Sequence, residues 1–351
     1  MADFKDIIGQ EHIKKNLLSA IAKNKPSHAY IIAGEQGNGR TMLTEAFIKT
    51  LLCTGNIEKK HSIRFHLQEN PSDLKAVLGL DACDICKSCL QSESHNNPDV
   101  TYVTHEGASI SVDDIREQVN NRVDIKPLVS DYKIFVIRDA DKMTEEAQNA
   151  LLKTIEEPPE YVIIILISEN ENTLLSTILS RCVVLKTRPI DKKTIAEYLS
   201  NTLQMEPYSA EIAANFCQGN MGRAIHFAGS ENFIELKNSV LSLMKRIDSM
   251  LAVDIVDAIN KIAEDRQQIN DYLDLMLLWY RDILMFKVTK DANILLYKDE
   301  YSAISEQASK RGYEDIEHII DGISTAKLRL AANVNFETAI ELMLLNIKDG
   351  C

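Results

Sequence analysis

Residues Gly34–Thr41, with the sequence GEQGNGRT, match the phosphate-loop pattern G-x-x-x-x-G-K-[ST] at every position except one. Arg40 stands where the pattern has lysine, and its planar guanidinium is wider than the compact ammonium that reaches between phosphates. Thr41 keeps the hydroxyl that ligates Mg²⁺ in such loops. The backbone curl would come from three glycines, Gly34, Gly37 and Gly39. The loop by itself leaves weak nucleotide binding open, the alternative being a glycine-rich turn that binds nothing.

The second half of a nucleotide site is expected on the stretch KIFVIRDADKM, residues 133–143. Phosphate-loop enzymes hold Mg²⁺ with a carboxylate at the end of this strand and orient water with a following acid. If Ala140-Asp141 aligns with the end of a D-E-A-D box, the metal-binding position is Arg138 and the next is Asp139. Unit charges about 4 Å apart interact by about 4 kcal/mol at an effective dielectric near 20, so Arg138 would repel the metal. An alignment shifted by one residue makes Asp139 the ligand but Ala140 the base, so both alignments predict loss of ATP hydrolysis.

Four cysteines have the spacing C-x29-C-x2-C-x2-C, which offers the thiolate set of a closed, tetrahedral zinc site: Cys53, Cys83, Cys86 and Cys89. The close trio is the strong part of this pattern, and a redox C-x-x-C motif would not need a third cysteine at equal spacing. The assignment of Cys53 is weaker, because a histidine could be the fourth ligand instead: His61, His66 or His95. A site without an open coordination position is structural, so we expect a zinc-stapled module over about residues 53–98. Its intervening residues, 54–82, read as a loose, polar insertion.

The elements that must position these residues alternate between strand-like and helical patterns over the first half of the chain. Such alternation is typical of a parallel sheet covered on both faces. The expected strands are HAYIIAG, DVTYV, KIFVIRD, YVIIILIS and RCVVLKT. Amphipathic helices are expected around Ile13, Leu17 and Ile21 and around Ala147, Leu151 and Ile155, the second with Thr144 as its cap. After Pro189 the strand signal disappears, and INDYLDLMLLWYRDILMF is apolar nearly all round, which indicates a buried bundle helix or a subunit interface.

Composition narrows the class of protein further. The chain has 351 residues, 45% hydrophobic and 26% charged, so we expect two or three globular domains. Its longest apolar run is strand-sized and its N-terminus lacks the pattern of a signal peptide, which predicts no membrane segment and a cytoplasmic location. A formal charge of −13 opposes tight nucleic-acid binding by the chain as a whole, so any DNA role would need partners or a local patch.

With these residues in view, the chain resembles the delta-prime family of bacterial DNA polymerase III clamp-loader subunits, in the AAA+ superfamily. The resemblance covers nearly the whole chain and rests on DIIGQEHI, SHAYIIAG, DADKMTEEAQNALLKTIEEPP, TILSRCVVL and LLWYRDIL. It implies three domains: an α/β AAA+ parallel-sheet domain like that of P-loop NTPases, with the zinc module inserted (1–188), a small helical lid (189–230), and an all-α collar for oligomerisation (231–351).

The resemblance also implies a function. Such a subunit is a stator, inactive as an ATPase by itself, in a ring that loads the sliding clamp on primed DNA. Its partners would be the tau/gamma and delta subunits, the clamp, and DNA through the complex, within a holoenzyme that has DNA-directed DNA polymerase activity. Arg181, flanked by Ser180 and Cys182, is similar to the arginine finger that reaches a neighbour's ATP.

Two further family positions depart from an active ATPase. The sensor-1 polar residue corresponds to Ser168, and the sensor-2 arginine position is Gly222, with Arg223 one residue later. The alternative function is an ATP-hydrolysing motor subunit of the tau/gamma type, in which Arg40 substitutes for lysine.

Overall fold

The computed structural model describes residues 3–69, 76–228, 231–264, 266–332 and 334–349. Contacts within the chain divide it into two compact units. Unit 1 comprises residues 1–190 with 219–222, and unit 2 comprises residues 191–218 with 223–351. No helix in the described ranges combines the length and apolarity needed to cross a bilayer.

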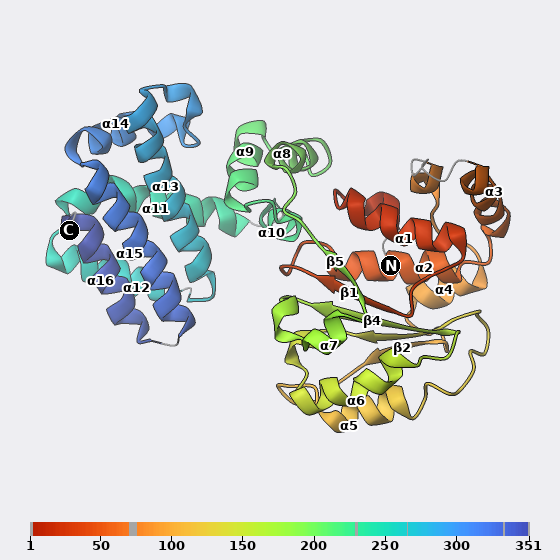
Figure 1. The fold of residues 1–351 in the computed structure, drawn as a ribbon. Helices are drawn as coiled ribbons and strands as arrows, with labels where there is room; N and C mark the ends of the chain where they lie inside the picture. Colours follow the sequence, from red (N-terminus) through yellow and green to blue (C-terminus); the bar gives the residue numbers. More distant parts are fainter. Residues whose placement is uncertain (1–2, 70–75, 229–230, 265, 333, 350–351) are drawn as a thin grey trace. The chain divides into compact units, whose positions relative to one another are not determined.

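Unit 1 is built on a parallel sheet of five strands in the order β2-β3-β4-β1-β5 (Figure 1). All five strands predicted from the sequence are present: β1 (Ala29–Ala33), β2 (Val100–Val103), β3 (Lys133–Ile137), β4 (Val162–Ser168) and β5 (Val183–Lys186). Its helices are α1 (Glu11–Lys23), α2 (Arg40–Leu52), α3 (Ile57–Glu69), α4 (Lys87–Glu93), α5 (Val112–Ile115), which continues as a π-helical turn (Arg116–Asn120), α6 (Glu145–Glu156) and α7 (Ser176–Leu179).

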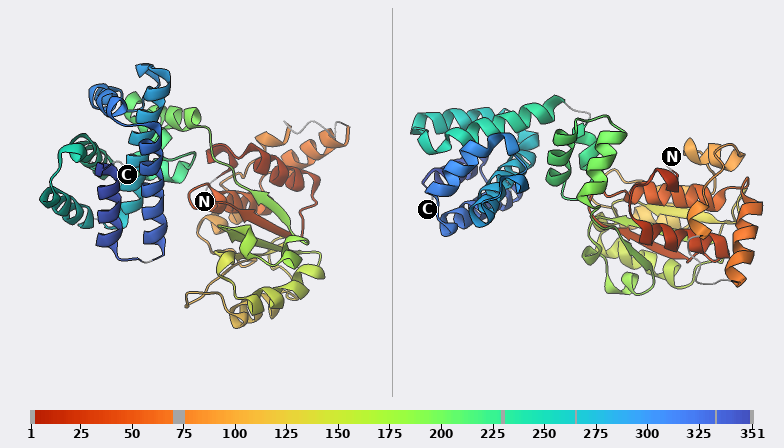
Figure 2. Two further views of the ribbon diagram at one scale, coloured as in Figure 1. Left: turned by 60° about the vertical axis from the view of Figure 1, so that its left-hand side comes forward. Right: turned by 90° about the horizontal axis from the view of Figure 1, so that it is seen from above.

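Alternate strand residues feed two cores, one on each face of the sheet. Tyr30 and Ile32 of β1 pack with α1, α2 and α3, whereas Ile31 packs with α5, α6 and α7 on the opposite face. Figures 1 and 2 show these two helical layers with the sheet between them. Because both faces are covered, all seven residues of β4 are buried, which explains its continuous apolar sequence.

The local signals predicted for α1 and α6 are confirmed. In α1, Ile13, Leu17 and Ile21 are buried. The Thr144 hydroxyl caps α6 by accepting a hydrogen bond from the Ala147 amide at 3.2 Å. Both helices thus bury the apolar face that the sequence predicts.

The prediction of a loose, polar insertion over residues 54–82 is wrong for much of that segment. Residues Ile57–Glu69 form α3, which packs against α1 through Ile63 and Leu67. A pair of apolar residues four apart is enough to seat one face of a helix, even where lysine and histidine dominate the remainder. Val77 is also buried in this core, and residues 70–75 lie outside the described ranges.

Unit 2 contains helices only among its described residues, consistent with the loss of strand signal after Pro189. Its helices are α8 (Lys192–Asn201), α9 (Pro207–Phe216), α10 (Met221–Ala228), which begins in unit 1, α11 (Glu231–Arg246), α12 (Ala252–Ala263), α13 (Ile269–Thr289), α14 (Tyr301–Lys310), α15 (Tyr313–Ala331) and α16 (Phe336–Asp349). The nearly all-apolar helix predicted from the sequence is α13, which packs against α11, α14 and α15. Its Trp279 and Tyr280 are fully buried.

Candidate nucleotide and metal sites

The phosphate loop joins β1 to α2, as its sequence context predicts. Gly34 and Gly37 have φ angles of 140° and 90°, in the range that side chains rarely adopt. A Cβ atom on Gly37 would lie 2.2 Å from the side-chain oxygen of Asn220, so crowding adds to the backbone requirement. Gly39 then provides the left-handed cap at the start of α2, and Thr41 is exposed in its first turn.

Arg40 is turned into the protein and is only 8% exposed. Its Nη2 lies 3.1 Å from Oε1 of Glu169, the residue that follows β4. The other terminal nitrogen, Nη1, is buried and has no hydrogen-bond partner among the described residues. The cation that replaces the phosphate-binding lysine therefore has its counter-ion within the chain.

Residues 219–222 lie directly against the phosphate loop. The Asn220 side-chain amide donates to the Gln36 carbonyl at 2.7 Å, and the Gly222 amide donates to the Gly37 carbonyl at 2.9 Å. A Cβ atom on Gly222 would lie 2.6 Å from Cα of Gly37, so a larger residue does not fit this packing. Gly222 is the residue that the sequence aligns with the sensor-2 arginine. Nothing in the sequence pointed to Asn220, which is about 180 residues from its partner.

Arg223, the residue after Gly222, is engaged within unit 2. Its Nη2 pairs with Asp271 at 2.7 Å and with Asp274 at 3.1 Å, both on α13, and its guanidinium stacks on Phe216. Within unit 2, Arg223 thus joins α13 to the end of α9.

The end of β3 carries a paired cation. Arg138 Nη2 lies 3.2 Å from Oε1 of Glu45 on α2, and its guanidinium stacks on Tyr102 with 4.9 Å between Cζ and the ring centroid. Asp139 pairs with Lys142 at 3.0 Å, and Asp141 accepts the Glu169 amide at 2.9 Å. The two carboxylates after this strand are therefore each engaged within unit 1.

The residue predicted at the sensor-1 position, Ser168, also forms its hydrogen bond with a nearby residue. Ser168 is fully buried at the end of β4, and its hydroxyl donates to the Asn170 carbonyl at 2.9 Å. This hydrogen bond serves the turn that follows β4.

Arg181 lies just beyond α7 with its side chain 39% exposed. Its Nη1 donates to the Thr177 carbonyl at 2.9 Å and to the Ser180 hydroxyl at 3.2 Å, and its Nη2 pairs with Glu156 at 3.0 Å. Cys182 packs toward the core, and burial raises the pKa of its thiol to about 12. Arg181 is thus held at the surface, whereas Cys182 anchors the segment.

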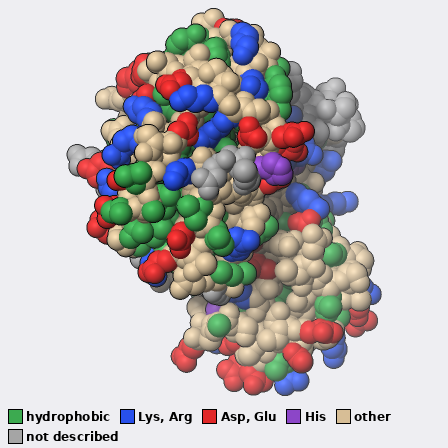
Figure 3. Space-filling model, turned by 90° about the vertical axis from the view of Figure 1, so that its left-hand side faces the viewer, with side chains coloured by type: hydrophobic (Ala, Val, Ile, Leu, Met, Phe, Trp, Pro, Cys, Tyr) green, Lys and Arg blue, Asp and Glu red, His purple; other side chains and the backbone are tan. Residues whose placement is uncertain are grey.

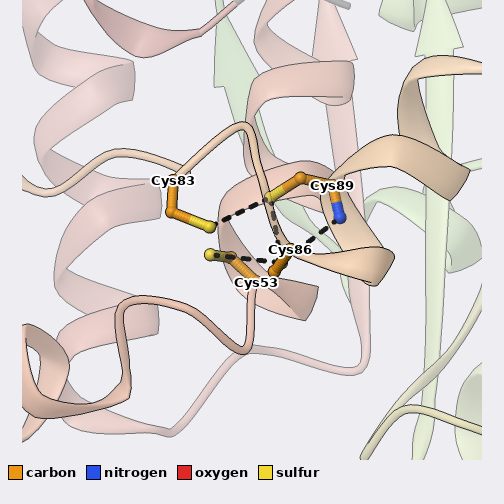
Figure 4. Close-up of side chains that lie close together, drawn as sticks. All are labelled: Cys53, Cys83, Cys86 and Cys89. Atoms are coloured by element: carbon orange, nitrogen blue, oxygen red, sulfur yellow. Dashed lines mark hydrogen bonds between the residues drawn. The ribbon is translucent and has the colours of Figure 1, made fainter.

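The four predicted cysteines come together (Figure 4). Their sulfurs all lie within 4.8 Å of one another, with Sγ separations of 3.4 Å for Cys86–Cys89, 3.9 Å for Cys83–Cys89 and 4.0 Å for Cys53–Cys86. Tetrahedral zinc with Zn–S bonds of about 2.3 Å requires sulfurs about 3.8 Å apart, so the donor set fits. Within the described part of the chain, this group contains no histidine, so His61, His66 and His95 are not members.

The local backbone structure brings the four thiols together. Cys53 follows the last residue of α2, and Cys86 caps α4, accepting the Cys89 amide on its sulfur at 3.5 Å. Burial opposes ionisation of Cys86, but hydrogen bonds from the Thr54 hydroxyl and the Cys89 amide outweigh it and bring its pKa to about 5. Burial raises the pKa of Cys89. Hydrogen bonding thus favours the thiolate form of Cys86.

A buried lysine to which no sequence pattern pointed, Lys49, ties the cysteine module to the rest of unit 1. Lys49 on α2 has a side chain 2% exposed and contacts three carboxylates: Asp3 at 3.0 Å, Asp84 at 2.6 Å and Glu93 at 3.5 Å. Burial disfavours its charge, but the hydrogen bonds that its ammonium donates to Asp84 and Asp3 prevail and raise the pKa of Lys49. The four residues form what we call the Lys49 network, which spans the N-terminus, α2 and the cysteine module.

Comparison with known proteins identifies the family. The family model described as DNA polymerase III, delta subunit, matches residues 9–191, just over half of the chain. The chain is 28% identical to DNA polymerase III subunit delta' of Bacillus subtilis, over 97% of each protein. It is 26% identical to DNA polymerase III subunit tau of the same organism, over 96% of this chain but 60% of that protein. A crystal structure of a gamma subunit-related protein of Thermotoga maritima superposes loosely, with a TM-score of 0.42 at 16% identity, over 96% of this chain and 99% of that one. The chain belongs to the DNA polymerase III delta subunit family and resembles delta-prime clamp-loader subunits along its whole length.

Proposed function

We propose that this chain is a non-catalytic stator of a bacterial DNA polymerase III clamp loader. In this role it helps other subunits to load the sliding clamp on primed DNA and does not hydrolyse ATP by itself. The observation that carries the proposal is Arg138, a cation paired with Glu45 at the strand end where phosphate-loop ATPases hold Mg²⁺. Full-length similarity to a delta-prime subunit supports the same role.

The degenerate phosphate loop, Gly34, Gly37, Gly39, Arg40 and Thr41, fits this inactive role. Arg40 is neutralised by Glu169, and two loop carbonyls are bound by residues 219–222. A nucleotide would have to compete with both sets of contacts. We infer that retained nucleotide binding is weak or absent.

We further propose that Arg181 acts in trans, as an arginine finger toward ATP bound by a neighbouring subunit. Its guanidinium is partly exposed and is paired with Glu156, itself 45% exposed, and such surface pairs contribute only about 0–1 kcal/mol. Exchanging Glu156 for a γ-phosphate would therefore cost little. A guanidinium suits that charge because it forms two parallel hydrogen bonds.

The expected partners are tau/gamma and delta subunits, the clamp, and primed DNA through the complex, in the cytoplasm. Residues 189–230 would serve as the lid and 231–351 as the collar that joins the ring. The face of unit 2 in Figure 3 has hydrophobic side chains gathered among charged ones. Exposed apolar residues on and just before α12, Leu251, Val253 and Val256, are suited to burial against a neighbouring subunit.

We propose a structural zinc ion for the group Cys53, Cys83, Cys86 and Cys89. Four thiols with suitable separations leave no coordination position for a substrate, which favours a structural role. The metal would hold the end of α2 to α4 and neutralise thiolate charge in a partly buried setting.

Two measurements test the stator proposal. Titration of the isolated chain with Mg-ATP should give no micromolar binding and no turnover. In a reconstituted complex, Arg181→Ala should assemble normally but lower hydrolysis at the affected site by about a thousandfold or more. Arg181→Lys should be impaired as well, because an ammonium does not reproduce the guanidinium fork. Unchanged ATPase in both variants would exclude the finger, and turnover by the isolated chain would exclude the stator.

A motor subunit of the tau/gamma type is the second candidate, favoured by the similarity to tau over 96% of this chain. Arg138 distinguishes the two candidates, since a motor needs a metal ligand at that position. Turnover by this chain alone would support the motor.

A further inference from the structure

A cavity of about 240 Å³ lies beside the cysteine module, where the ends of α1 and α2 meet α3. Its polar lining includes Asn24 at the end of α1, three basic side chains on α3, Lys60, His61 and Arg64, and Ser130. The one carboxylate in the lining is Asp131. A hollow lined by amide, hydroxyl and cationic groups is suited to an oxyanion such as phosphate.

The cations around this cavity have spare hydrogen-bonding capacity. Arg64 donates to the Ala22 carbonyl through Nε at 3.1 Å, which leaves its terminal nitrogens for another acceptor. Lys23 and Lys25 flank Asn24 and are exposed. Among the described residues, no carboxylate forms an ion pair with Arg64, Lys23 or Lys25. A local basic patch thus exists on a chain whose formal charge is −13.

Lys60 has a different role from its neighbours. Its Nζ donates to the Leu51 carbonyl at 3.0 Å and to the Cys53 carbonyl at 2.8 Å, and burial lowers its pKa. It holds the chain at the first cysteine, which leaves Arg64 as the cation of the lining that is available to a ligand. Lys23 and Lys25 lie outside the lining but are exposed on either side of Asn24.

An exposed aromatic residue, Phe65, is next to Arg64 in the sequence of α3. Phe65 is 63% exposed and follows Arg64 on α3, one turn beyond His61. Ile57, also on α3, is 50% exposed. Exposed aromatic rings beside cations are the surfaces on which unpaired bases stack, whereas a phosphate ion gains nothing from them.

We propose that this face of α1 and α3 binds single-stranded nucleic acid, with a backbone phosphate at Arg64 and Asn24 and a base on Phe65. Free phosphate or a nucleotide shares the phosphate chemistry, but Phe65 and the flanking Lys23 and Lys25 favour a polynucleotide. The site differs from the phosphate loop and does not depend on the proposed stator role.

The test is fluorescence anisotropy of a labelled oligothymidylate with the full-length chain over a range of salt concentrations. The variant Lys25→Gln/Arg64→Gln should bind at least fivefold more weakly, and its dependence of log K on log salt should fall by about one per cation removed. Phe65→Ala should weaken binding about fivefold or more without changing that slope.

Matched controls keep the test decisive. Lys153→Gln/Arg329→Gln removes one exposed lysine and one exposed arginine elsewhere and should bind like the parent chain. Because Arg64 also contacts Ala22, Lys23→Gln/Lys25→Gln should reproduce the loss without touching that contact. Arg181→Ala should bind normally, which separates this site from the stator proposal.

Two results would overturn the proposal. One is equal weakening by the control pair, which would mean that binding follows net charge alone. The other is displacement of the oligonucleotide by inorganic phosphate at constant ionic strength together with normal binding by Phe65→Ala, which would mean that the cavity is a simple anion site.

Discussion

At the scale of single residues, two arginines favour the proposed stator over an ATPase. Arg40 and Arg138 each stand at a position that normally serves the nucleotide or its metal, and each pairs with a glutamate, Glu169 or Glu45. A lone substitution of lysine by arginine in the loop would still allow an anion to bind. In the proposed stator, a cation at the metal position and an internal counter-ion for Arg40 would together oppose the binding of Mg-ATP.

The buried Lys49 leads to a prediction about the stability of the protein. Lys49→Met should lower the free energy of unfolding by about 3 kcal/mol at neutral pH, because it removes the buried partner of the Asp3 carboxylate and leaves it with the exposed Lys5. Burial raises the pKa of Asp3, but hydrogen bonds from Lys5 and Lys49 outweigh it and lower the pKa below its ordinary value. A lowered carboxyl pKa adds stability above the unfolded-state pKa, which is lost as pH falls through the folded-state value.

The difference between Lys49→Met and the parent chain should therefore shrink below about pH 4. Denaturant unfolding at several pH values would measure it. Lys5→Met is the matched control, since Lys5 is 63% exposed and its pair with Asp3 contributes less. A constant difference across pH would contradict the role given to Asp3.

At the scale of elements, α2 connects the two candidate sites. It begins at the phosphate loop with Gly39 as its cap and ends at Cys53, about 20 Å away at 1.5 Å per residue. Lys49, one turn before Cys53, joins it to Asp84 and Glu93 of the cysteine module. The cysteine module is therefore attached by ion pairs to α2, the helix that follows the phosphate loop.

This arrangement predicts which elements loosen when the proposed zinc ion is lost. Cys86→Ser should abolish stoichiometric zinc, measured by elemental analysis, because a serine hydroxyl is a poor zinc ligand. Hydrogen exchange should rise in α4 and the last turn of α2, while β3 and β4 stay protected. Cys182→Ser, outside the group, should keep its zinc. Normal zinc content in Cys86→Ser would contradict the proposed ligand set.

At the scale of the whole molecule, each compact unit has its own core and its own buried polar contacts. In unit 2, Asp282 on α13 is fully buried and accepts the amides of Leu296 and Tyr297 at 2.7 and 2.9 Å. Trp279 donates to Gln307 at 3.1 Å, and Gln307 donates to the Met244 carbonyl at 2.7 Å. These contacts fix how loops and helices pack around α13.

Asp282→Ala should consequently destabilise unit 2 by about 3 kcal/mol, because it leaves two buried amides without an acceptor. Hydrogen exchange should accelerate in α13 and α14 but not in the sheet of unit 1. Asp321→Ala, at an exposed position on α15, is the control and should change little. Equal acceleration in both units would mean that they unfold as one.

The sequence alone was sufficient for the strands of unit 1 and for those helices whose signals are local. Five strands, the stripe of α1, the cap of α6 and the glycine-rich loop depend on neighbours within a few residues, and all were predicted. The spacing of Cys83, Cys86 and Cys89 is likewise a local signal. The helix α3 was missed because its apolar face is only two residues wide amid polar ones.

Tertiary structure decided what those elements do together. The pairing of Arg40 with Glu169, the contact of Asn220 with Gln36, the Lys49 network and the position of Cys53 join residues that lie about 30 to 180 positions apart. Folding alone brings such residues within hydrogen-bonding distance, because short-range propensity carries no information about which distant side chain will be the partner. For this protein, the sequence predicted a phosphate loop with arginine in place of lysine. The fold supplied Glu169 as the counter-ion of that arginine and placed Asn220 and Gly222 against the carbonyl groups of the loop.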